Sequence, residues 1–192
     1  KFRRHCSPSA HPLAHAVESN RVWCADFKGW FRTGDGSRID PLTVSDAYSR
    51  YLLACQGMCG KTDTVHVKGV FEALFRAYGM PERIRTDNGS PFASTGLAGL
   101  SRLAVWWMRL GIVPERIKPA TPSENGRHER MHLTLKQDTA MPPASTPKKQ
   151  QEAFEHFLNY YNAERPHEAL GQVVPASVYT PSPRPYPARL PA

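Results

Sequence analysis

The stretch RVWCADFKGWFRTGDGSRIDPLTVSDAYSRYLLACQGM, residues 21–58, holds three extended patterns separated by two turns, and this order determines which fold is expected. Residues 21–31 alternate apolar and polar side chains and are rich in aromatic ones, which is typical of a β-strand. TGDGS at 33–37 and SDAYS at 45–49 are typical of turns, and an extended pattern follows each of them. The stretch therefore predicts a meander of three antiparallel strands.

Helices and short strands alternate after this meander. Apolar residues at helical spacing predict a helix within 62–80, with Thr62 or Asp63 as its N-terminal cap and Gly79 at its end. Strands that alternate with helices after a meander indicate a mixed sheet with helices on its faces, which is an α/β fold. The later elements are expected as a strand in 81–89, a helix in 97–111, a strand in 112–120, and helices at about 126–140 and 148–162.

Both ends of the chain predict linkers or tails. Residues 1–20 contain Ser, Pro and His without periodicity, and residues 181–192 are rich in proline. A length of 192 residues favours one well-buried domain. We therefore expect a leader at 1–20, one folded core at 21–180 and a proline-rich tail at 181–192. Because the sequence has no signal-peptide pattern and no initiator methionine, we expect a fragment of a longer chain.

The charge balance predicts a nucleic-acid partner. The chain has 25 Lys and Arg against 17 Asp and Glu, a net charge of +8. Its basic residues are spread through the predicted core, which favours a basic face that attracts polyanions. The four cysteines form no CxxC pair, so neither a disulfide framework nor a zinc site is expected, and a reducing, cytosolic setting fits best. No apolar run reaches the length of a membrane span.

Three acidic positions stand where this order of elements can bring them together. Asp26 lies in the middle of the first strand, Asp87 at the end of the fourth, and a glutamate near the start of the penultimate helix. Taken singly, Asp26 can lie on a solvated strand face, and Asp-Asn-Gly at Asp87 is also a turn signal. As a set they suit hard divalent cations, and two such ions can activate a nucleophilic oxygen and stabilise the leaving one. The expected reaction is phosphodiester hydrolysis or strand transfer.

Two glutamates compete for the third position. Glu124 closes a capping-box pattern that begins at Thr121, or else stays in a loop before Gly126. Glu129 and Lys136 are seven residues apart, so on a helix they lie within about 20° of each other, beside the apolar stripe. Helix geometry therefore favours Glu129 as a ligand, and the alternative is that both residues are exposed surface charges.

Four motifs together resemble the integrase catalytic core of bacterial insertion-sequence transposases, which are relatives of retroviral integrases. They are WCADFKG (23–29), TDNGSPF (86–92), NGRHERMHLTLK (125–136) and YNAERPHEALGQVVPASVY (161–179), and the likeness covers roughly residues 20–180. It implies a ribonuclease H-like fold, in which helices flank a five-stranded mixed sheet whose first three strands are antiparallel.

The resemblance also implies the DDE triad of this family, carried over as Asp26, Asp87 and Glu129. These residues would be catalytic and would bind Mg²⁺ or Mn²⁺, with two ions expected. The activity implied is that of a metal-dependent polynucleotidyl transferase, which cleaves a DNA strand and transfers it to a target.

Further residues are expected to contact DNA. Lys136 matches a family basic position near the DNA end, and Asn125 falls in the loop ahead of the catalytic helix. Arg127 and Arg130 would hold phosphates beside them. RPHEAL (165–170) matches a family hallmark that serves either packing or DNA contact.

The resemblance implies that the chain binds transposon ends and target DNA, as a homo-oligomer assembled on the DNA. It also implies that no membrane is involved and that the protein acts in the bacterial cytoplasm, at the nucleoid. Family members recognise their ends with helix-turn-helix modules ahead of the core, where this sequence has a twenty-residue leader. Two alternatives remain open at this point. One is a nuclease of the same fold without strand transfer, and the other is a non-catalytic DNA-binding remnant.

Overall fold

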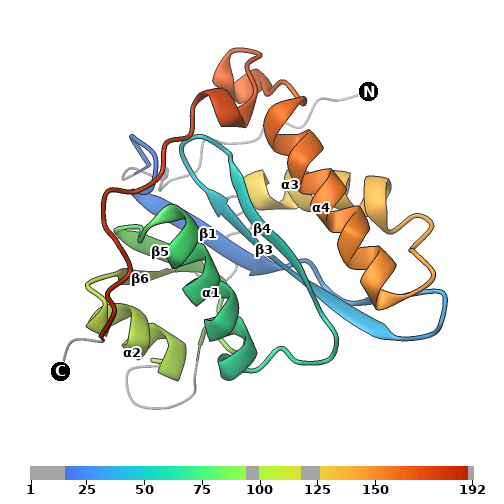
Figure 1. Ribbon diagram of the computed structural model, residues 1–192, viewed down its shortest axis with the longest axis horizontal. Coiled ribbons are helices and arrows are strands. Elements are labelled where there is room, and N and C mark those ends of the chain that lie inside the picture. Colours follow the sequence, from blue (N-terminus) through green and yellow to red (C-terminus); the bar gives the residue numbers. More distant parts are fainter. Residues whose placement is uncertain (1–15, 94–99, 118–125, 190–192) are drawn as a thin grey trace, which may run out of the picture.

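The predicted meander forms the antiparallel half of one mixed sheet (Figure 1). This computed structural model describes residues 16–93, 100–117 and 126–189, with the side chains of 126–129 excepted. The elements are β1 (Val22–Phe27), β2 (Phe31–Arg32), β3 (Arg38–Asp46), β4 (Leu52–Met58), α1 (Thr64–Tyr78), β5 (Arg83–Thr86), α2 (Arg102–Arg109), β6 (Val113–Arg116), α3 (Gly126–Thr139), α4 (Pro147–Ala163), and the 3-10 turns η3 (Glu168–Leu170) and η4 (Pro175–Ser177).

The sheet runs in the order β4, β3, β1, β5, β6. β3 is antiparallel to both β4 and β1, whereas β5 is parallel to β1 and β6 is parallel to β5. The sequence pattern predicted one strand over residues 21–31. The pairing of this segment with β3 stops after Phe27 and resumes at Phe31, so β2 is a separate two-residue strand. Three antiparallel strands followed by two parallel ones confirm the predicted mixed sheet.

Helix ends follow local capping chemistry. Asp63, one of the two predicted caps, accepts hydrogen bonds from the backbone nitrogens of Val65 and His66 and starts α1. Gly79 ends α1 with a φ of 75°, a region that favours glycine. Ser101 caps α2 through the backbone nitrogen of Ala104, which explains why the described helix starts at 102. The predicted helices at 126–140 and 148–162 are confirmed as α3 and α4.

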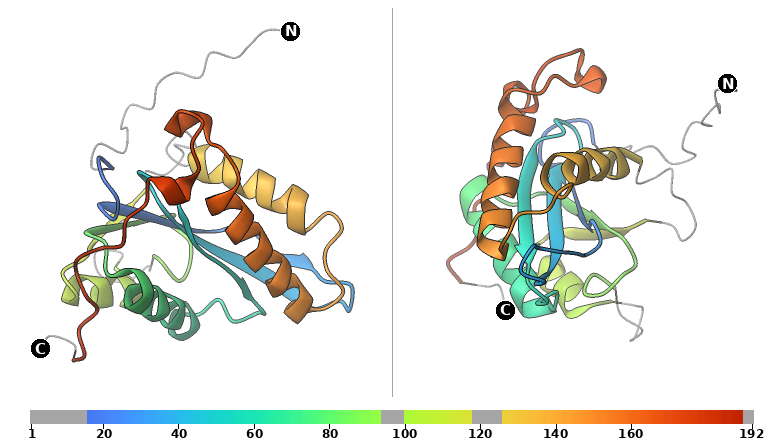
Figure 2. Two further views of the ribbon diagram at one scale, coloured as in Figure 1. Left: turned by 45° about the horizontal axis from the view of Figure 1, so that its top comes forward. Right: turned by 90° about the vertical axis from the view of Figure 1, so that its right-hand side faces the viewer.

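The helices divide between the two faces of the sheet, and each face has its own apolar cluster (Figure 2). α1 and α2 cover one face, where large aromatic side chains such as Trp23, Phe71 and Trp107 are fully buried. α3 covers the other face and packs with α4 over a smaller cluster that includes Leu135 and Phe154. The fold thus separates a large aromatic core from a thinner second layer.

Side-chain amides of α4 satisfy the backbone of β4, the edge strand. The Asn162 side chain donates to the Leu52 carbonyl and accepts from the Leu52 nitrogen, both at 2.8 Å. The Gln151 side chain accepts from the Gly57 nitrogen at 2.9 Å. Covering an edge in this way prevents it from pairing with another chain.

The residues after η4 run back over α1 and α2. We call residues 179–189 the C-terminal strap. The backbone nitrogen of Ser182 donates to the Tyr78 carbonyl, and that of Met80 donates to the Arg184 carbonyl, both at 2.7 Å. The Arg184 side chain donates to the carbonyls of Pro81 and Gly111 at 2.6 and 3.0 Å. The predicted boundary at residue 180 stays a prediction, but the described residues beyond it pack on the core.

Across the described ranges, no helix is both long and apolar enough to cross a membrane.

Candidate active site

Asp26 and Asp87 are brought side by side by the parallel pairing of β1 with β5. Ala25 pairs with Thr86 at the end of this ladder; Asp26 is the next residue of β1, and Asp87 is the first residue after β5. Neighbouring strands lie about 4.8 Å apart, and residues in register point to the same face. Both aspartates are half-buried. The two strands are therefore neighbours, as the predicted convergence of these positions requires, and the shared site stays a prediction.

Strand alternation decides which face the aspartates share. Trp23, Ala25 and Ile84 belong to the aromatic cluster under α1 and α2. Asp26 follows Ala25 and therefore points the other way. Because its partner across the antiparallel ladder is Thr43, these two side chains also share a face.

A hydrogen bond places α3 over that same face. Thr43 Oγ1 lies 2.7 Å from Nε2 of His132, which belongs to α3, and 3.2 Å from the Asp26 carbonyl oxygen. Met131 and Leu135 anchor the helix in the second apolar cluster. Asp26 thus lies between Asp87 on one neighbouring strand and the Thr43–His132 contact on the other. His132 was not among the predicted site residues, since its only signal in the sequence is its position three residues after Glu129 in a helix.

Asp87 also has the turn role that its sequence suggested. Its Oδ1 accepts from the Gly89 nitrogen at 3.1 Å, and a Cβ at position 89 would come within 3.0 Å of Oδ2. Asn88 Nδ2 donates to the Ile117 carbonyl at 2.8 Å, which ties the turn to the chain just after β6. Turn chemistry and a place beside Asp26 are therefore compatible, because the turn holds the carboxylate just past the end of β5.

The third predicted ligand is described only through its backbone. Glu129 lies in the first turn of α3, while its side chain and that of Arg127 lie outside the described residues, as do Asn125 and Glu124 entirely. Among the side chains that the structure describes, no group of three His, Cys, Asp or Glu could hold a metal ion. The described part contributes two neighbouring carboxylates, and the triad stays a prediction.

Lys136 lies in a groove of about 470 Å³ that begins where β1 ends. Lys28, Trp30 and His132 line the same groove. Burial lowers the pKa of the Lys28 ammonium, and the nearby charge of Lys136 lowers it further. Two cations that repel each other in this way favour an anion between them.

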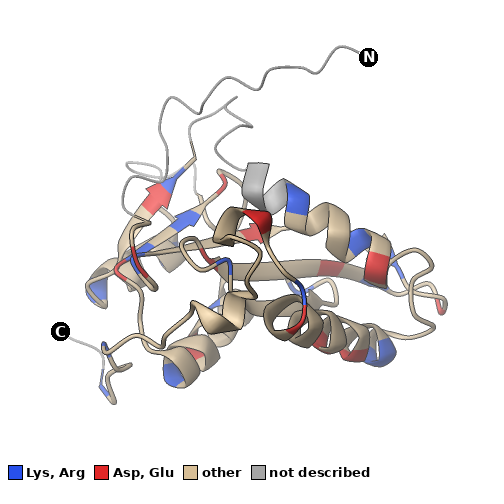
Figure 3. Cartoon of the chain, turned by 90° about the horizontal axis from the view of Figure 1, so that it is seen from above, with Lys and Arg blue, Asp and Glu red and all other residues tan. Residues whose placement is uncertain are grey.

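An exposed aromatic ring extends this groove. Trp30 is 55% exposed, and the guanidinium carbons of Arg38 and Arg32 lie 5.0 and 5.9 Å from its ring centroid. Such contacts orient the arginines beside a flat apolar surface. Figure 3 shows basic residues along α3 after its first turn. Arg130 is exposed too, but it lines a different groove from Lys136.

The family follows from comparison with known proteins. Two family models, both described as integrase core domain, match residues 16–122 and 110–175. The chain belongs to the integrase core domain family, as its motifs predicted.

Two relatives come from bacterial insertion elements. An uncharacterized 39.2 kDa protein of insertion element IS476 from Xanthomonas euvesicatoria is 27% identical over 159 residues, covering 82% of this chain and 43% of the relative. An uncharacterized 31.7 kDa protein of insertion element IS407 from Burkholderia multivorans is 25% identical over 168 residues, covering 85% and 57%. The chain spans about half the length of the curated relatives it matches.

Solved structures confirm the ribonuclease H-like fold. The HTLV-2 integrase catalytic core domain in complex with magnesium superimposes with a TM-score of 0.64 at 16% identity, covering 85% of this chain and 98% of that one. The catalytic core domain of BIV integrase gives a TM-score of 0.60 at 20% identity, covering 83% and 93%. At these identities the likeness shows the fold, so a role for each residue has to rest on this chain's own geometry.

Proposed function

We propose that this chain is the catalytic part of a DNA transposase, which cleaves a DNA strand at an element end and joins the exposed 3′-hydroxyl to target DNA. The observation that carries the proposal is the parallel pairing of β1 with β5 beneath α3, because Asp26 and Asp87 each follow the last pair of that ladder. Membership of the integrase core domain family and relatives from insertion elements support the same activity.

Asp26 and Asp87 are the proposed metal ligands, and Glu129 is proposed to complete the site. Neighbouring half-buried carboxylates suit a hard divalent cation, because without one their charges repel. The magnesium in complex with the HTLV-2 integrase core supports Mg²⁺, with Mn²⁺ as the alternative and two ions expected. When bound, such ions polarise the phosphate and lower the pKa of the attacking water or hydroxyl.

The chain's other residues position the substrate. His132 contacts Thr43 of the sheet, and we propose that this contact sets the distance between position 129, three residues earlier in α3, and the two aspartates. Lys28 and Lys136 are proposed to hold phosphates beside the scissile bond, since both line the groove at the end of β1. Arg127 and Asn125 are proposed as further DNA contacts.

The proposed partner is DNA, bound by an oligomer of this chain. The HTLV-2 integrase core is described in dimeric and trimeric forms, and a related viral integrase in an intasome. Because a transposition event joins two element ends to one target, an oligomer would place two active sites on one DNA complex. Action on DNA in the bacterial cytoplasm is part of the same proposal.

The test measures cleavage of an element-end duplex and joining of a pre-cut end to a plasmid, with and without Mg²⁺. Asp26→Asn and Asp87→Asn keep the side-chain shape and remove a ligand charge. We expect each to lower both rates by roughly 10³-fold, because a metal supplies several kcal/mol of transition-state stabilisation. Asp138→Asn, an exposed aspartate on the same helix as Glu129, is the matched control and should retain full activity.

Three results would change this proposal. Metal-dependent cleavage without any joined product would reduce the function to that of a nuclease. Cleavage that survives Asp87→Asn would remove the aspartate from the site. An absence of metal-dependent cleavage in the unaltered chain would favour a non-catalytic DNA-binding remnant.

A further inference from the structure

A second groove lies where three separate parts of the chain meet, away from the groove that holds Lys136. Its volume is about 580 Å³. Arg50 comes from the turn between β3 and β4, Arg130 from α3, and Arg165 and His167 from the segment that follows α4. We call the groove lined by these four residues the arginine groove.

Backbone contacts hold the segment after α4 in place. The Arg165 nitrogen donates to the Tyr160 carbonyl at 3.0 Å, and the His167 nitrogen donates to the Val173 carbonyl at 3.0 Å. The imidazole of His167 also packs edge-on against the Tyr161 ring, with centroids 4.6 Å apart. His167 therefore has a packing role, but nothing in these contacts uses the guanidinium of Arg165.

One polar atom in the groove is left without a partner. Nε2 of His167 is buried and has no hydrogen-bond partner among the described residues. The imidazole ring does form a hydrogen bond with the backbone of Tyr161. Burial lowers the pKa of His167, and the charges of Arg165 and Arg50 lower it further, so both arginines lie close enough to act on the ring. A buried polar atom without a partner is costly, and a bound ligand is one way of satisfying it.

The charges of the groove fit an anion. Glu168 is the acidic residue among the described residues that line it, and within the described ranges neither Arg130 nor Arg165 forms a salt bridge. Guanidinium groups bind phosphate oxygens through two parallel hydrogen bonds. An anion would also favour protonation of His167, which makes Nε2 a donor to it.

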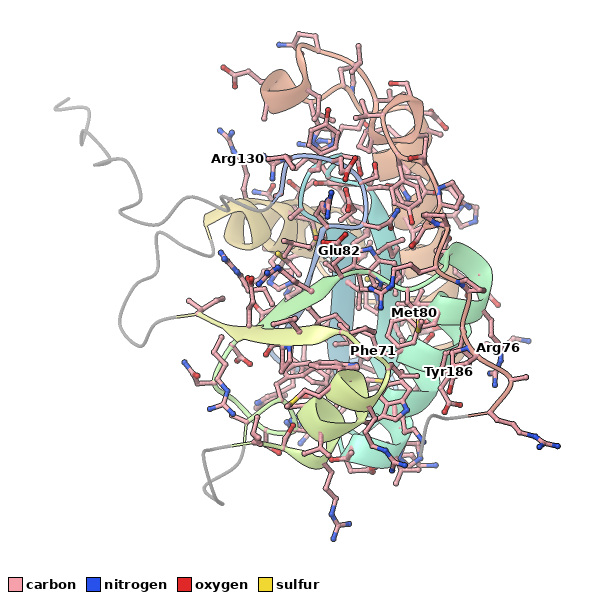
Figure 4. The ribbon with its side chains drawn as sticks, turned by 90° about the vertical axis from the view of Figure 1, so that its left-hand side faces the viewer. Phe71, Arg76, Met80, Glu82, Arg130 and Tyr186 are labelled. Atoms are coloured by element: carbon pink, nitrogen blue, oxygen red, sulfur yellow. The ribbon has the colours of Figure 1, made fainter. Side chains whose placement is uncertain are left out.

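We propose that the arginine groove binds a backbone phosphate of DNA, at a contact separate from the Asp26–Asp87 site. The proposal rests on DNA being the substrate. Figure 4 labels Arg130, which lies near the segment that follows α4 and on the opposite side of the molecule from Arg76. Positions 130 and 136 are six residues apart, or about 9 Å along α3, so one duplex can reach both grooves. RPHEAL then has a DNA contact in addition to its packing.

The experiment measures binding of a DNA duplex by fluorescence anisotropy in EDTA, across a series of chloride concentrations. Arg165→Gln should weaken binding about tenfold, the size expected for one charge-assisted hydrogen-bonding pair. Because the groove is proposed to hold one phosphate, the slope of log K against log salt should become shallower by about 0.9 in Arg130→Gln/Arg165→Gln, and by less than that in Arg165→Gln alone. Arg165→Lys should keep the slope and lose only part of the affinity, because it keeps the charge without the planar fork.

Arg76→Gln is the matched control, because Arg76 is an exposed arginine on α1, and its binding and slope should equal those of the unaltered chain. Thermal melting checks that each variant folds. If the folded Arg165→Gln and double variants bind DNA like the control, the groove is not a DNA contact. Mg²⁺-dependent cleavage by the same variants would then show that the proposed function stands without this contact. If instead inorganic phosphate, at constant ionic strength, protects the unaltered chain against melting while DNA binding is unchanged by the variants, the groove is a small-anion site and the proposal fails.

Discussion

The two faces of one sheet carry different kinds of residue. The face under α1 and α2 holds a continuous aromatic core, in which Phe71 lies 5.0 Å from Trp107 and 5.9 Å from Phe75 between ring centroids. The face under α3 holds a smaller apolar cluster together with two aspartates, a histidine and two basic grooves. Successive residues of β1 supply both, since Ala25 points into the core and Asp26 points away from it.

This contrast indicates where stability and chemistry are expected to separate. Apolar burial contributes roughly 25 cal/mol per Å², so the aromatic face should dominate the free energy of unfolding. Carboxylates and cations that gather on one surface add little stability and suit a ligand that is both metal-bound and anionic. Substitutions in the aromatic core under α1 and α2 should therefore change stability. Substitutions of charged residues on the face under α3 should change function alone.

The largest stability effect is expected from Phe71→Ala. Phe71 is fully buried in the aromatic core between the sheet and its helices, so its removal should cost about 3–5 kcal/mol of unfolding free energy through reduced burial and the cavity left behind. Urea or thermal unfolding measures this cost. Leu133→Ala on α3 is the control, because Leu133 is 57% exposed and should change stability by less than about 0.5 kcal/mol. Equal effects for the two variants would abolish the contrast between the faces.

A smaller effect is expected from Arg184→Ala in the C-terminal strap. The Arg184 side chain donates to the carbonyls of Pro81 and Gly111, which lie just before the neighbouring strands β5 and β6. Hydrogen bonds from a charged donor contribute about 1.5–3 kcal/mol, which corresponds to a fall in Tm of roughly 3–12 °C for a domain of this size. Arg189→Ala, also in the strap but exposed, should leave the Tm unchanged. An unchanged Tm in Arg184→Ala as well would show that the strap does not stabilise the aromatic face.

Much of the fold was predictable because its signals are local. The period-two pattern and turns of residues 21–58, the helical spacing in 62–80 and the Asp63 and Gly79 caps each involve neighbours in sequence. The prediction of one strand over 21–31 missed the break between Phe27 and Phe31, where Gly29 has a φ of 91° and the pairing with β3 is interrupted.

Long-range contacts explain the remaining differences. The strap has the composition of a tail, and its order comes from carbonyls a hundred residues away, such as that of Pro81. That β1 and β5 are neighbours could be anticipated from the order of elements, and Asp26 and Asp87 each lie one residue beyond the last pair of that ladder. The contact from His132 to Thr43 could not, since a single histidine on an amphipathic helix indicates no partner.

The proposed metal site is tested most sharply by comparing two glutamates in the Mg²⁺-dependent cleavage assay. Both Glu129→Gln and Glu124→Gln remove one negative charge without changing side-chain size. We predict that Glu129→Gln abolishes strand cleavage, because it removes the third metal ligand on α3, while Glu124→Gln retains most of it. Cleavage that is lost in Glu124→Gln and kept in Glu129→Gln would contradict the assignment of the site.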